Sequence, residues 1–324
     1  MKQIIVKEND AGQRVDKFLT KAFPLLPASM MYKGIRTKNI KLNGKRCEIS
    51  TKLSVGDVLT LYLKDECLEQ VDPVYDFMTA GKQLDIVYED EHLLLLNKKV
   101  GLLVHPDDNE YRDTLIARVQ RYLYEKGEYD PAAENSFVPS LVNRIDRNTC
   151  GIVIAAKTAA ALRILNAKLR AREIEKYYLC IVHGQMPQPE GLLEGYLEKD
   201  EEHNRVYVSE RYRAGMRSIA TRYKVLKEKP GYSLLEIELL TGRTHQIRAH
   251  MAHVGAPLLG DGKYGTNAAN AKFGGYKKQF LYSYKTVFDF STDAGLLNYL
   301  KGKAVTAENV WFAENFPDQI LTAK

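Results

Sequence analysis

The chain has 324 residues, of which 45% are hydrophobic and 27% are charged, and it is long enough for two domains with substantial cores. No apolar run approaches the length of a membrane span and residues 1–7 lack a signal-peptide core, so we expect a cytoplasmic protein with no membrane partner. No Cys-x-x-Cys pair occurs among the four cysteines (Cys47, Cys67, Cys150 and Cys180), which argues against a zinc site or a disulfide framework.

The positive charge of the chain is concentrated at its N-terminus. Residues 1–63 carry 12 Lys and Arg against 5 Asp and Glu, a net charge of +7, whereas the other 261 residues carry 35 against 36. A basic module attached to a near-neutral body suggests a surface that docks on a polyanion. A merely solvated basic face is the alternative, and the strong segregation of charge disfavours it.

A helix over 15–22 is the clearest element of this basic segment, because apolar residues recur at helical spacing from Val15 to Ala22 and Pro24 follows. A tight turn is expected at Asn43-Gly44, between two strands. The other predicted elements are a strand over 3–7, a helix over 27–35, and strands over 40–42 and 58–63.

Three short motifs in the same segment resemble the alpha-L RNA-binding domain. They are Arg-Val-Asp-Lys-Phe-Leu at 14–19, Ile-Lys-Leu-Asn-Gly-Lys at 40–45 and Val-Gly-Asp at 55–57. The resemblance implies that a basic helix face and the adjacent turn grip structured RNA through phosphates, which supplies affinity and orientation rather than base identity. The cations that it implicates are Arg14, Lys17, Lys33, Arg36, Lys38, Lys41, Lys45 and Arg46.

An acidic, irregular stretch over 64–80 is predicted to link this module, residues 1–63, to a large strand-rich domain over 81–324. The clearest helix of that domain covers 158–172 with Thr158 as its N-cap, and another is expected over 244–254. In the tail from 292 onward, Trp311 and Phe312 leave open whether it packs on the body or contacts RNA. The predicted strands cover 84–88, 93–97, 152–156, 177–182, 220–226 and 233–239.

The segment from Asn143 to Gly151 is the most informative of the chain. Its sequence, Asn-Arg-Ile-Asp-Arg-Asn-Thr-Cys-Gly, places Asp146 between two arginines, just before an apolar run that predicts a buried strand. A carboxylate with cations on both sides is held ionised, as a nucleophile or a general base requires. Taken alone, an ordinary ion pair on a surface turn is the simpler interpretation.

A second motif, Lys-Tyr-Tyr-Leu-Cys-Ile-Val at 176–182, predicts a strand. Alternation along this strand places Tyr178 on one face with Cys180 and Val182, and Tyr177 on the other face. A tyrosine facing a nucleotide pocket offers a flat surface on which a base can stack. Packing into the core is the alternative for this side chain.

A third motif, Thr-Gly-Arg-Thr-His-Gln-Ile-Arg at 241–248, marks the junction of a strand and a helix. Arg243 lies at the turn and Arg248 one helical turn inside, where arginines suit a carboxylate or a phosphate. Three histidines follow at 245, 250 and 253, but their spacing differs from that of the His-Glu-x-x-His zinc helix. We therefore expect no metal site here.

In this order, the three motifs resemble those of the RluA-type pseudouridine synthase family, as in large-subunit ribosomal RNA pseudouridine synthases. A fourth family motif, Gly-Asp-x-x-Tyr-Gly, matches Gly-Asp-Gly-Lys-Tyr-Gly at 260–265, and the resemblance covers roughly residues 81 to 290. It implies an α+β protein in which the small alpha-L module precedes a large mixed, mainly antiparallel sheet. Uridine-to-pseudouridine conversion is an isomerisation without redox change or net hydrolysis, so we expect no metal, nicotinamide or nucleotide cofactor.

The resemblance also implies roles for individual residues. Asp146 would be the catalytic aspartate, Tyr178 the tyrosine that stacks on the base, and Arg248 the arginine paired with the aspartate. The residues implied to contact RNA around the extruded uridine are Arg144, Arg243, His245 and Gln246.

Four positions depart from the family pattern: Asn143 replaces His, Ile145 replaces Leu, Cys150 replaces Ser and Lys99 replaces Pro. None of these changes removes the aspartate, the tyrosine or either arginine. The change at Asn143 is expected to alter the contact that this side chain makes beside the base, and with it the target choice or the rate.

The leading hypothesis is an RNA pseudouridine synthase that acts as a monomer on large-subunit ribosomal RNA, with transfer RNA as the alternative substrate. A catalytically silent RNA-binding or ribosome-assembly factor is the second class, motivated by the changes at Asn143 and Cys150. A hydrolase ranks last, because no residue is in evidence that would activate a water molecule for Asp146.

Overall fold

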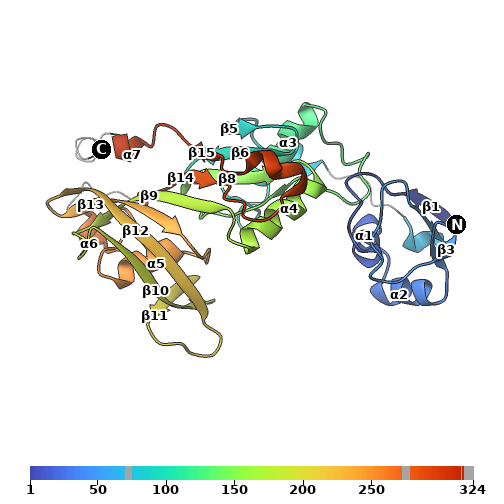
Figure 1. Cartoon of the computed structure of the whole chain (residues 1–324), viewed down its shortest axis with the longest axis horizontal. Coiled ribbons are helices and arrows are strands. Elements are labelled where there is room, and N and C mark those ends of the chain that lie inside the picture. The colour runs from blue at the N-terminus through green and yellow to red at the C-terminus, as the bar shows by residue number, and fades with distance from the viewer. Residues whose placement is uncertain (70–74, 272–277, 315, 317–324) are drawn as a thin grey trace.

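The computed structural model describes residues 1–69, 75–271, 278–314 and 316. They form two sheets, one of four strands at the N-terminus and one of eleven strands in the rest of the chain. Figure 1 shows the N-terminal module at one end of an elongated molecule, with the large sheet extending away from it. The expected α+β class with a small module before a large mixed sheet is confirmed.

The N-terminal module buries one core between two helices and its sheet. Val15, Phe18 and Leu19, which the sequence pattern assigned to one helix face, are fully buried in this core. Asn43 and Gly44 have φ angles of 50° and 73° and form the expected turn. The elements are β1 (Lys2–Ile5), α1 (Val15–Ala22), α2 (Ala28–Arg36), β2 (Ile40–Leu42), β3 (Lys45–Arg46) and β4 (Val58–Leu61), and the strand order is β1-β4-β2-β3.

The large sheet has two antiparallel halves that meet at one parallel pair of strands. Strands β8 and β14 run parallel and share two register pairs, Tyr282 with Cys150 and Ser283 with Gly151. The order is β11-β10-β12-β13-β9-β14-β8-β6-β5, with β15 added to β14 and β7 to β8. The strands are β5 (Ile86–Glu89), β6 (Leu93–Lys98), β7 (Ser140–Leu141), β8 (Cys150–Ala156), β9 (Glu175–His183), β10 (Glu190–Asp200), β11 (Arg205–Ser209), β12 (Arg217–Lys229), β13 (Tyr232–Leu239), β14 (Leu281–Val287) and β15 (Ala304–Thr306).

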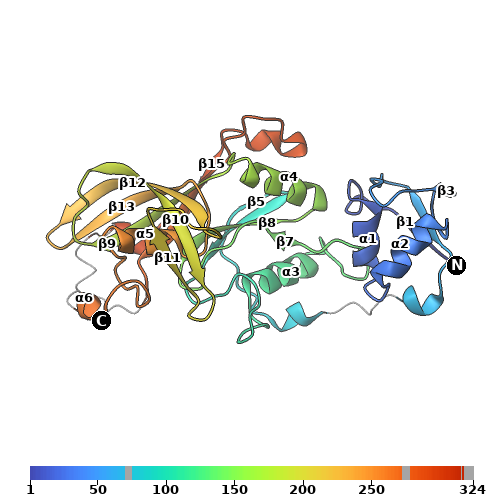
Figure 2. The same cartoon turned by 90° about the horizontal axis from the view of Figure 1, so that it is seen from below.

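Helices cover both faces of the half that contains β5, β6 and β8. Alternation along β6 sends Leu93 and Leu95 into the core under α4 (Ala159–Arg170), and Leu94 and Leu96 into the core under α3 (Leu115–Glu125). Figure 2 shows α4 and α3 on opposite sides of β5 and β8. A sheet that is buried on both faces explains why these strands read as continuous apolar runs.

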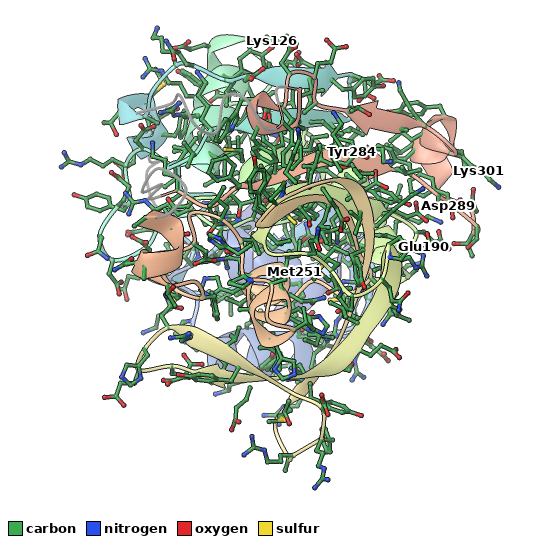
Figure 3. All side chains as sticks on the ribbon, turned by 90° about the vertical axis from the view of Figure 1, so that its left-hand side faces the viewer. Lys126, Glu190, Met251, Tyr284, Asp289 and Lys301 are labelled. Carbon is green, nitrogen blue, oxygen red and sulfur yellow. The ribbon has the colours of Figure 1, made fainter. Side chains whose placement is uncertain are left out.

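The other half of the sheet curves around α5 (Gln246–His253). Figure 3 looks onto this half, with Met251 of α5 near its centre and the strands around it. Met251 and Ile247 pack against Tyr178 and Ile237, which lie on the β9 and β13 side of the same core. Tyr178 faces this core together with Cys180 and Val182, whereas Leu179 and Ile181 face the core under α4, as the alternation predicts.

Helix α3 lies outside the predicted elements, although the sequence holds its signal. Thr114 caps α3 by accepting a hydrogen bond from the backbone N of Ala117 at 3.3 Å, just as Thr158 caps α4 by accepting one from Ala161 at 3.2 Å. Strands β10 and β11 also lie outside the predictions, because they form an edge hairpin whose side chains are mostly half-buried or exposed and which lacks a continuous apolar run.

The described part of the C-terminal tail packs on the body. Strand β15 pairs with β14, and the short helix α7 (Trp311–Glu314) brings the Trp311 and Phe312 rings to 4.7 and 5.5 Å from the Phe280 ring. Phe312 is buried in the core under α4. Of the two alternatives for this tail, packing on the body therefore holds for residues up to 314 and for 316, and the rest of the tail lies outside the described residues.

A polar contact joins the N-terminal module to the body. Asp10 is fully buried and accepts hydrogen bonds from Asn135 Nδ2 and Ser136 Oγ, each at 2.6 Å. Asn9 Oδ1 accepts one from the backbone N of Ala159, at the start of α4. Residues 70–74 of the predicted linker lie outside the described residues, and the domain boundaries stay predictions. Within the described ranges, no helix is long and apolar enough to cross a membrane.

Candidate active site

Asp146 lies in the loop that connects β7 to β8, four residues before β8 begins. The backbone carbonyl of Asp146 accepts a hydrogen bond from the backbone N of Thr149 at 3.0 Å, which closes a tight turn. The Asp146 side chain is 25% exposed. A carboxylate on such a turn is accessible to a ligand while its backbone is held in place.

Lys98, the last residue of β6, supports this loop from inside the protein. Its ammonium group donates to the backbone carbonyls of Lys99, Leu102 and Arg147 at 2.8–3.1 Å. Burial lowers the pKa of Lys98 to about 8, an effect that the negative charge of Asp146 partly opposes. Lys98 thus ties the residue next to Asp146 to the end of β6.

Arg248 of α5 holds two carboxylates at once. Its Nη1 donates to Asp146 Oδ2 at 2.8 Å, while Nε and Nη2 donate to the two oxygens of Asp261 at 2.7 and 3.0 Å. The Asp261 side chain is 0% exposed and that of Arg248 is 10% exposed. Because the bidentate pair with Asp261 fixes the guanidinium plane, the remaining nitrogen is aimed at Asp146. Within the described residues nothing donates a hydrogen bond to Asp146 Oδ1, which leaves this oxygen available to a substrate.

Asp261 belongs to the Gly-Asp-Gly-Lys-Tyr-Gly loop, and the backbone N atoms of Lys263 and Tyr264 donate to its Oδ1. Burial alone would raise the pKa of Asp261, but its contacts with Arg248 and with these two N–H groups lower the pKa below its usual range. Gly260 begins the loop with a φ of 75°, and a Cβ there would lie 2.1 Å from the carbonyl of Lys278. This loop therefore places an ionised carboxylate behind Arg248.

Tyr178 reaches the site through strand register. It pairs with Ser283 of β14, which in turn pairs with Gly151 of β8. Gly151 has a φ of 106°, and a Cβ there would lie 2.1 Å from the Ser283 carbonyl, so only glycine lets these strands meet. Tyr178 is 4% exposed; burial and the nearby charge of Asp146 raise its pKa to about 12. The tyrosine therefore lies beneath the Asp146 loop as an un-ionised, buried ring.

His245 also borders the carboxylate. It precedes α5 with a φ of 53°, its Nδ1 lies 3.0 Å from the Tyr264 hydroxyl, and its Nε2 lies 3.8 Å from Asp146 Oδ2. Burial lowers the pKa of His245 even though the charge of Asp146 acts in the opposite direction. We expect a neutral imidazole here at pH 7, so that Arg248 is the cation facing Asp146.

The other expected RNA contacts fall into two groups. Arg144, two residues before Asp146, is exposed, and so is Arg243 in the turn before α5. Gln246 is only 2% exposed, and its amide group is used in hydrogen bonds to Thr241, to Thr221 and to the backbone. This placement does not fit the expected RNA contact of Gln246, because a buried and fully bonded amide anchors the start of α5 instead.

Asn143, which stands where the family carries His, also serves the fold. Its Oδ1 accepts a hydrogen bond from the backbone N of Ile154 in β8 at 2.8 Å. The side chain therefore steadies the β7–β8 hairpin that presents Asp146. This hydrogen bond gives the asparagine a role that the sequence did not reveal.

The basic side chains of the N-terminal module are mostly exposed. Arg14 is engaged by both oxygens of Asp16 at 3.0 Å, and Lys41 lies 5.3 Å from the centroid of the Tyr62 ring. No described carboxylate forms an ion pair with the remaining six candidates, which are Lys17, Lys33, Arg36, Lys38, Lys45 and Arg46.

Three residues of the site, Lys98, Asp261 and Tyr264, were not assigned a role from the sequence. Asp261 and Tyr264 belong to the fourth family motif, so their positions were visible, but their contacts with Arg248 and His245 were not. Across the described ranges, no group of three or more His, Cys, Asp or Glu is arranged to hold a metal ion.

The stability of the fold is expected to fall in acid because of His250, a buried histidine of α5. His250 is buried with Nδ1 3.0 Å from the Thr221 hydroxyl, and burial lowers its pKa to about 4. Below pH 6.5 the unfolded chain takes up a proton that the folded His250 refuses, so stability falls as the pH drops from 6.5 to 4, by about 3 kcal/mol at most. Thermal melts at pH 6.5 and 4.5 should show a smaller loss for His250→Asn than for the unmodified protein. The exposed His253→Asn is the matched control, and an equal loss in both variants would contradict the assignment.

Comparison with known proteins gives two family matches. Residues 92–253 match the family described as RNA pseudouridylate synthase, and residues 13–59 match the S4 domain. The first match contains Asp146, Tyr178 and Arg248, whereas Asp261 lies just beyond its end. The second match falls within the N-terminal four-stranded module.

Individual proteins agree with these matches. Ribosomal large subunit pseudouridine synthase C of Vibrio vulnificus is 35% identical over 272 residues, which cover 82% of this chain and 81% of that protein. A Mycoplasma capricolum protein described as an uncharacterized RNA pseudouridine synthase is 31% identical over 97% of this chain and 99% of its own length. The solved structure of human RNA pseudouridylate synthase domain containing 1 shares the fold, with a TM-score of 0.52 and 20% identity over 65% of this chain and 81% of that chain.

Proposed function

The chain belongs to the RNA pseudouridylate synthase family, and we propose that it isomerises specific uridines of large-subunit ribosomal RNA with Asp146 as the reacting carboxylate. The activity as an RNA pseudouridine synthase follows from the family. The ribosomal target rests on relatives that are named for the large subunit, such as the Vibrio protein. The role of Asp146 rests on the geometry of its site.

The observation that supports Asp146 most strongly is the chain of three charges Asp146, Arg248 and Asp261. One oxygen of Asp146 is held by Arg248 at 2.8 Å, and the other is open. A catalytic carboxylate requires this combination, because it must be ionised, oriented and reachable at the same time. Asp261 accepts hydrogen bonds from the other two guanidinium nitrogens, Nε and Nη2, so that Arg248 is fixed rather than mobile.

The reaction breaks the bond from ribose C1′ to uracil N1 and forms a bond from C1′ to C5. In one route Asp146 adds to C1′ as N1 leaves with its electron pair, and C5 then displaces the carboxylate. In the other route Asp146 takes a proton from C2′ and returns it after the uracil has turned. In both routes C5 finally loses its proton and N1 gains one, so the atoms balance without a cofactor.

The uridine must leave its base stack before either route can begin, at a cost of a few kcal/mol. The exposed Arg144, two residues before Asp146, is suited to hold the RNA open beside the extruded uridine. Tyr178 forms the floor below the loop, where its ring can support the uracil once the site opens. Binding energy from the N-terminal module offsets the remaining cost.

Neutralising cations of the N-terminal module should flatten the salt dependence of RNA binding. Lys33 and Arg36 are exposed at the end of α2 and have no described ion-pair partner. In the double variant Lys33→Gln, Arg36→Gln the slope of log Kd against log salt should fall by about 1.5, because each lost phosphate contact removes roughly 0.7–0.9. Filter binding between 50 and 200 mM salt would measure this. Lys224→Gln, Lys227→Gln on β12 is the matched control, and equal slopes in both double variants would contradict the docking surface.

The test of the proposed substrate is pseudouridine mapping by carbodiimide labelling and primer extension, on RNA from cells with and without this gene. We expect one or a few stops in large-subunit ribosomal RNA to disappear. Loss in transfer RNA alone would retain the enzyme and overturn the substrate. An unchanged map would overturn the activity in these cells and favour an RNA-binding role.

A further inference from the structure

A cation of the β10–β11 hairpin lies beside the site and has no role so far. Arg205, the first residue of β11, has its guanidinium carbon 5.1 Å from the centroid of the Tyr264 ring. The Arg248 guanidinium lies 5.2 Å from the centroid of the same ring. Because the backbone N of Val206 donates to the Tyr264 hydroxyl at 2.9 Å, the hairpin is fastened to this ring. Arg205 is thus one aromatic ring away from the group that holds Asp146.

Arg205 lacks a counter-ion. Within the described part of the chain it forms no ion pair, and its buried Nε has no hydrogen-bond partner. Lys199 of the same hairpin, by contrast, forms an ion pair with Glu201 at 2.8 Å. Two tyrosine rings lie against the Arg205 guanidinium, Tyr264 at 5.1 Å and Tyr207 at 5.6 Å from their centroids, but no described carboxylate does, so its charge is free to pair with an anionic ligand.

Lys263 brings a second cation to the same place. Its Nζ donates to the backbone carbonyl of Asn204, next to Arg205, at 2.7 Å, and it has no ion pair among the described residues. Burial lowers the pKa of Lys263, with further lowering by the charges of Arg248 and Arg205 and opposition from the nearby acids. Two cations without an ion pair among the described residues therefore lie on the Tyr264 side of a site whose third cation, Arg248, is already paired with Asp146 and Asp261.

We propose that Arg205 and Lys263 bind the backbone phosphate of the nucleotide whose ribose meets Asp146. A guanidinium can hold two phosphate oxygens at once, and an ammonium beside it adds a point charge. The phosphate and the reacting C1′ are carried by the same ribose, so the anion must lie close to Asp146 but not on it. Holding that phosphate would keep the extruded nucleotide from returning to its stack. This inference rests on the proposed function, because it takes Asp146 as the reacting carboxylate.

The test is the salt dependence of RNA binding in full-length protein that carries Asp146→Asn, so that no turnover intervenes. The probe is large-subunit ribosomal RNA purified from cells that lack this gene. Adding Arg205→Gln should weaken binding and lower the slope of log Kd against log salt by about one, the value for a single phosphate contact. Arg205→Lys, which keeps the charge, should restore the slope. Lys199→Gln, a paired cation of the same hairpin, is the matched control and should leave the slope unchanged.

Lys263→Gln keeps the backbone contacts of its loop and should lower the slope independently, which covers the case in which Arg205→Gln disturbs the hairpin. An unchanged slope in both Arg205→Gln and Lys263→Gln would overturn the proposal, as would an equal drop in Lys199→Gln. Because the measurement is one of binding and not of rate, it is separate from the role of Asp146 in the reaction. If Asp146→Asn alone proves active, the proposed chemistry fails while the phosphate contact is still measured.

Discussion

Replacing Asp146 by Asn is expected to reduce pseudouridine formation by about a thousandfold or more, because the amide can neither attack C1′ nor accept a proton from C2′. The amide oxygen can still accept the hydrogen bond from Arg248 Nη1, so the loop should keep its shape. RNA affinity should therefore stay within a few-fold of that of the unmodified protein. Single-turnover assays with RNA from cells that lack this gene would measure the rate, and filter binding would measure the affinity.

The control for this variant is Asp108→Asn, an exposed carboxylate of the same domain that forms no ion pair with Arg248. It should leave the rate unchanged, which shows that the loss of one negative charge is not itself the cause. A fully active Asp146→Asn enzyme would remove Asp146 from the chemistry and with it both proposed routes. An inactive variant with strongly weakened RNA binding would instead point to a role in binding.

Asp261→Asn is expected to lower the single-turnover rate about a hundredfold without a matching loss of RNA affinity, because catalytic groups that are misplaced by an ångström lose this order of rate. Arg248 would keep its contact with Asp146 but lose the bidentate partner that fixes its plane. The buried guanidinium would also be left with one carboxylate fewer, which should cost about 3 kcal/mol of stability. Rates at saturating RNA and urea unfolding would measure the two effects.

The matched control is Glu173→Gln, which breaks another buried ion pair, that of Lys168 and Glu173 at 2.6 Å beside α4. Both variants should be less stable, and the comparison belongs at a temperature where both are folded. If Glu173→Gln slows the reaction as much as Asp261→Asn does, the effect of Asp261 is a general one of stability. A loss of rate confined to Asp261→Asn, at saturating RNA, identifies it as the residue that positions Arg248.

Several features of this protein could be predicted because they depend on residues that are close together in the sequence. The helix over 15–22 was predictable because its apolar residues repeat at the helical period. The start of α4 was predictable because the hydroxyl of Thr158 can cap the first turn of a helix. The side of β9 on which Tyr178 lies followed from strict alternation along the strand. Asp146, Tyr178 and Arg248 were identifiable because their motifs are continuous in sequence.

Other features depend on residues far apart in the chain. The pairing of Arg248 with Asp146, 102 positions away, was expected from the family, but the fork that also holds Asp261 was not. The burial of Gln246 and the bond from Asn143 to β8 likewise depend on which strands lie beside them.

The sequence by itself determined where the motifs and the clearly periodic elements such as α1, α4 and β9 lie, because periodicity, capping and turn preferences act over a few residues. Only the tertiary structure decided which motifs meet. Gly151 of β8 and Tyr178 of β9 both lie opposite Ser283 of β14, and this register brings the loop of Asp146 over the tyrosine. The physical reason is that register and charge pairing between distant segments are set by burial of the shared core, which no local pattern encodes.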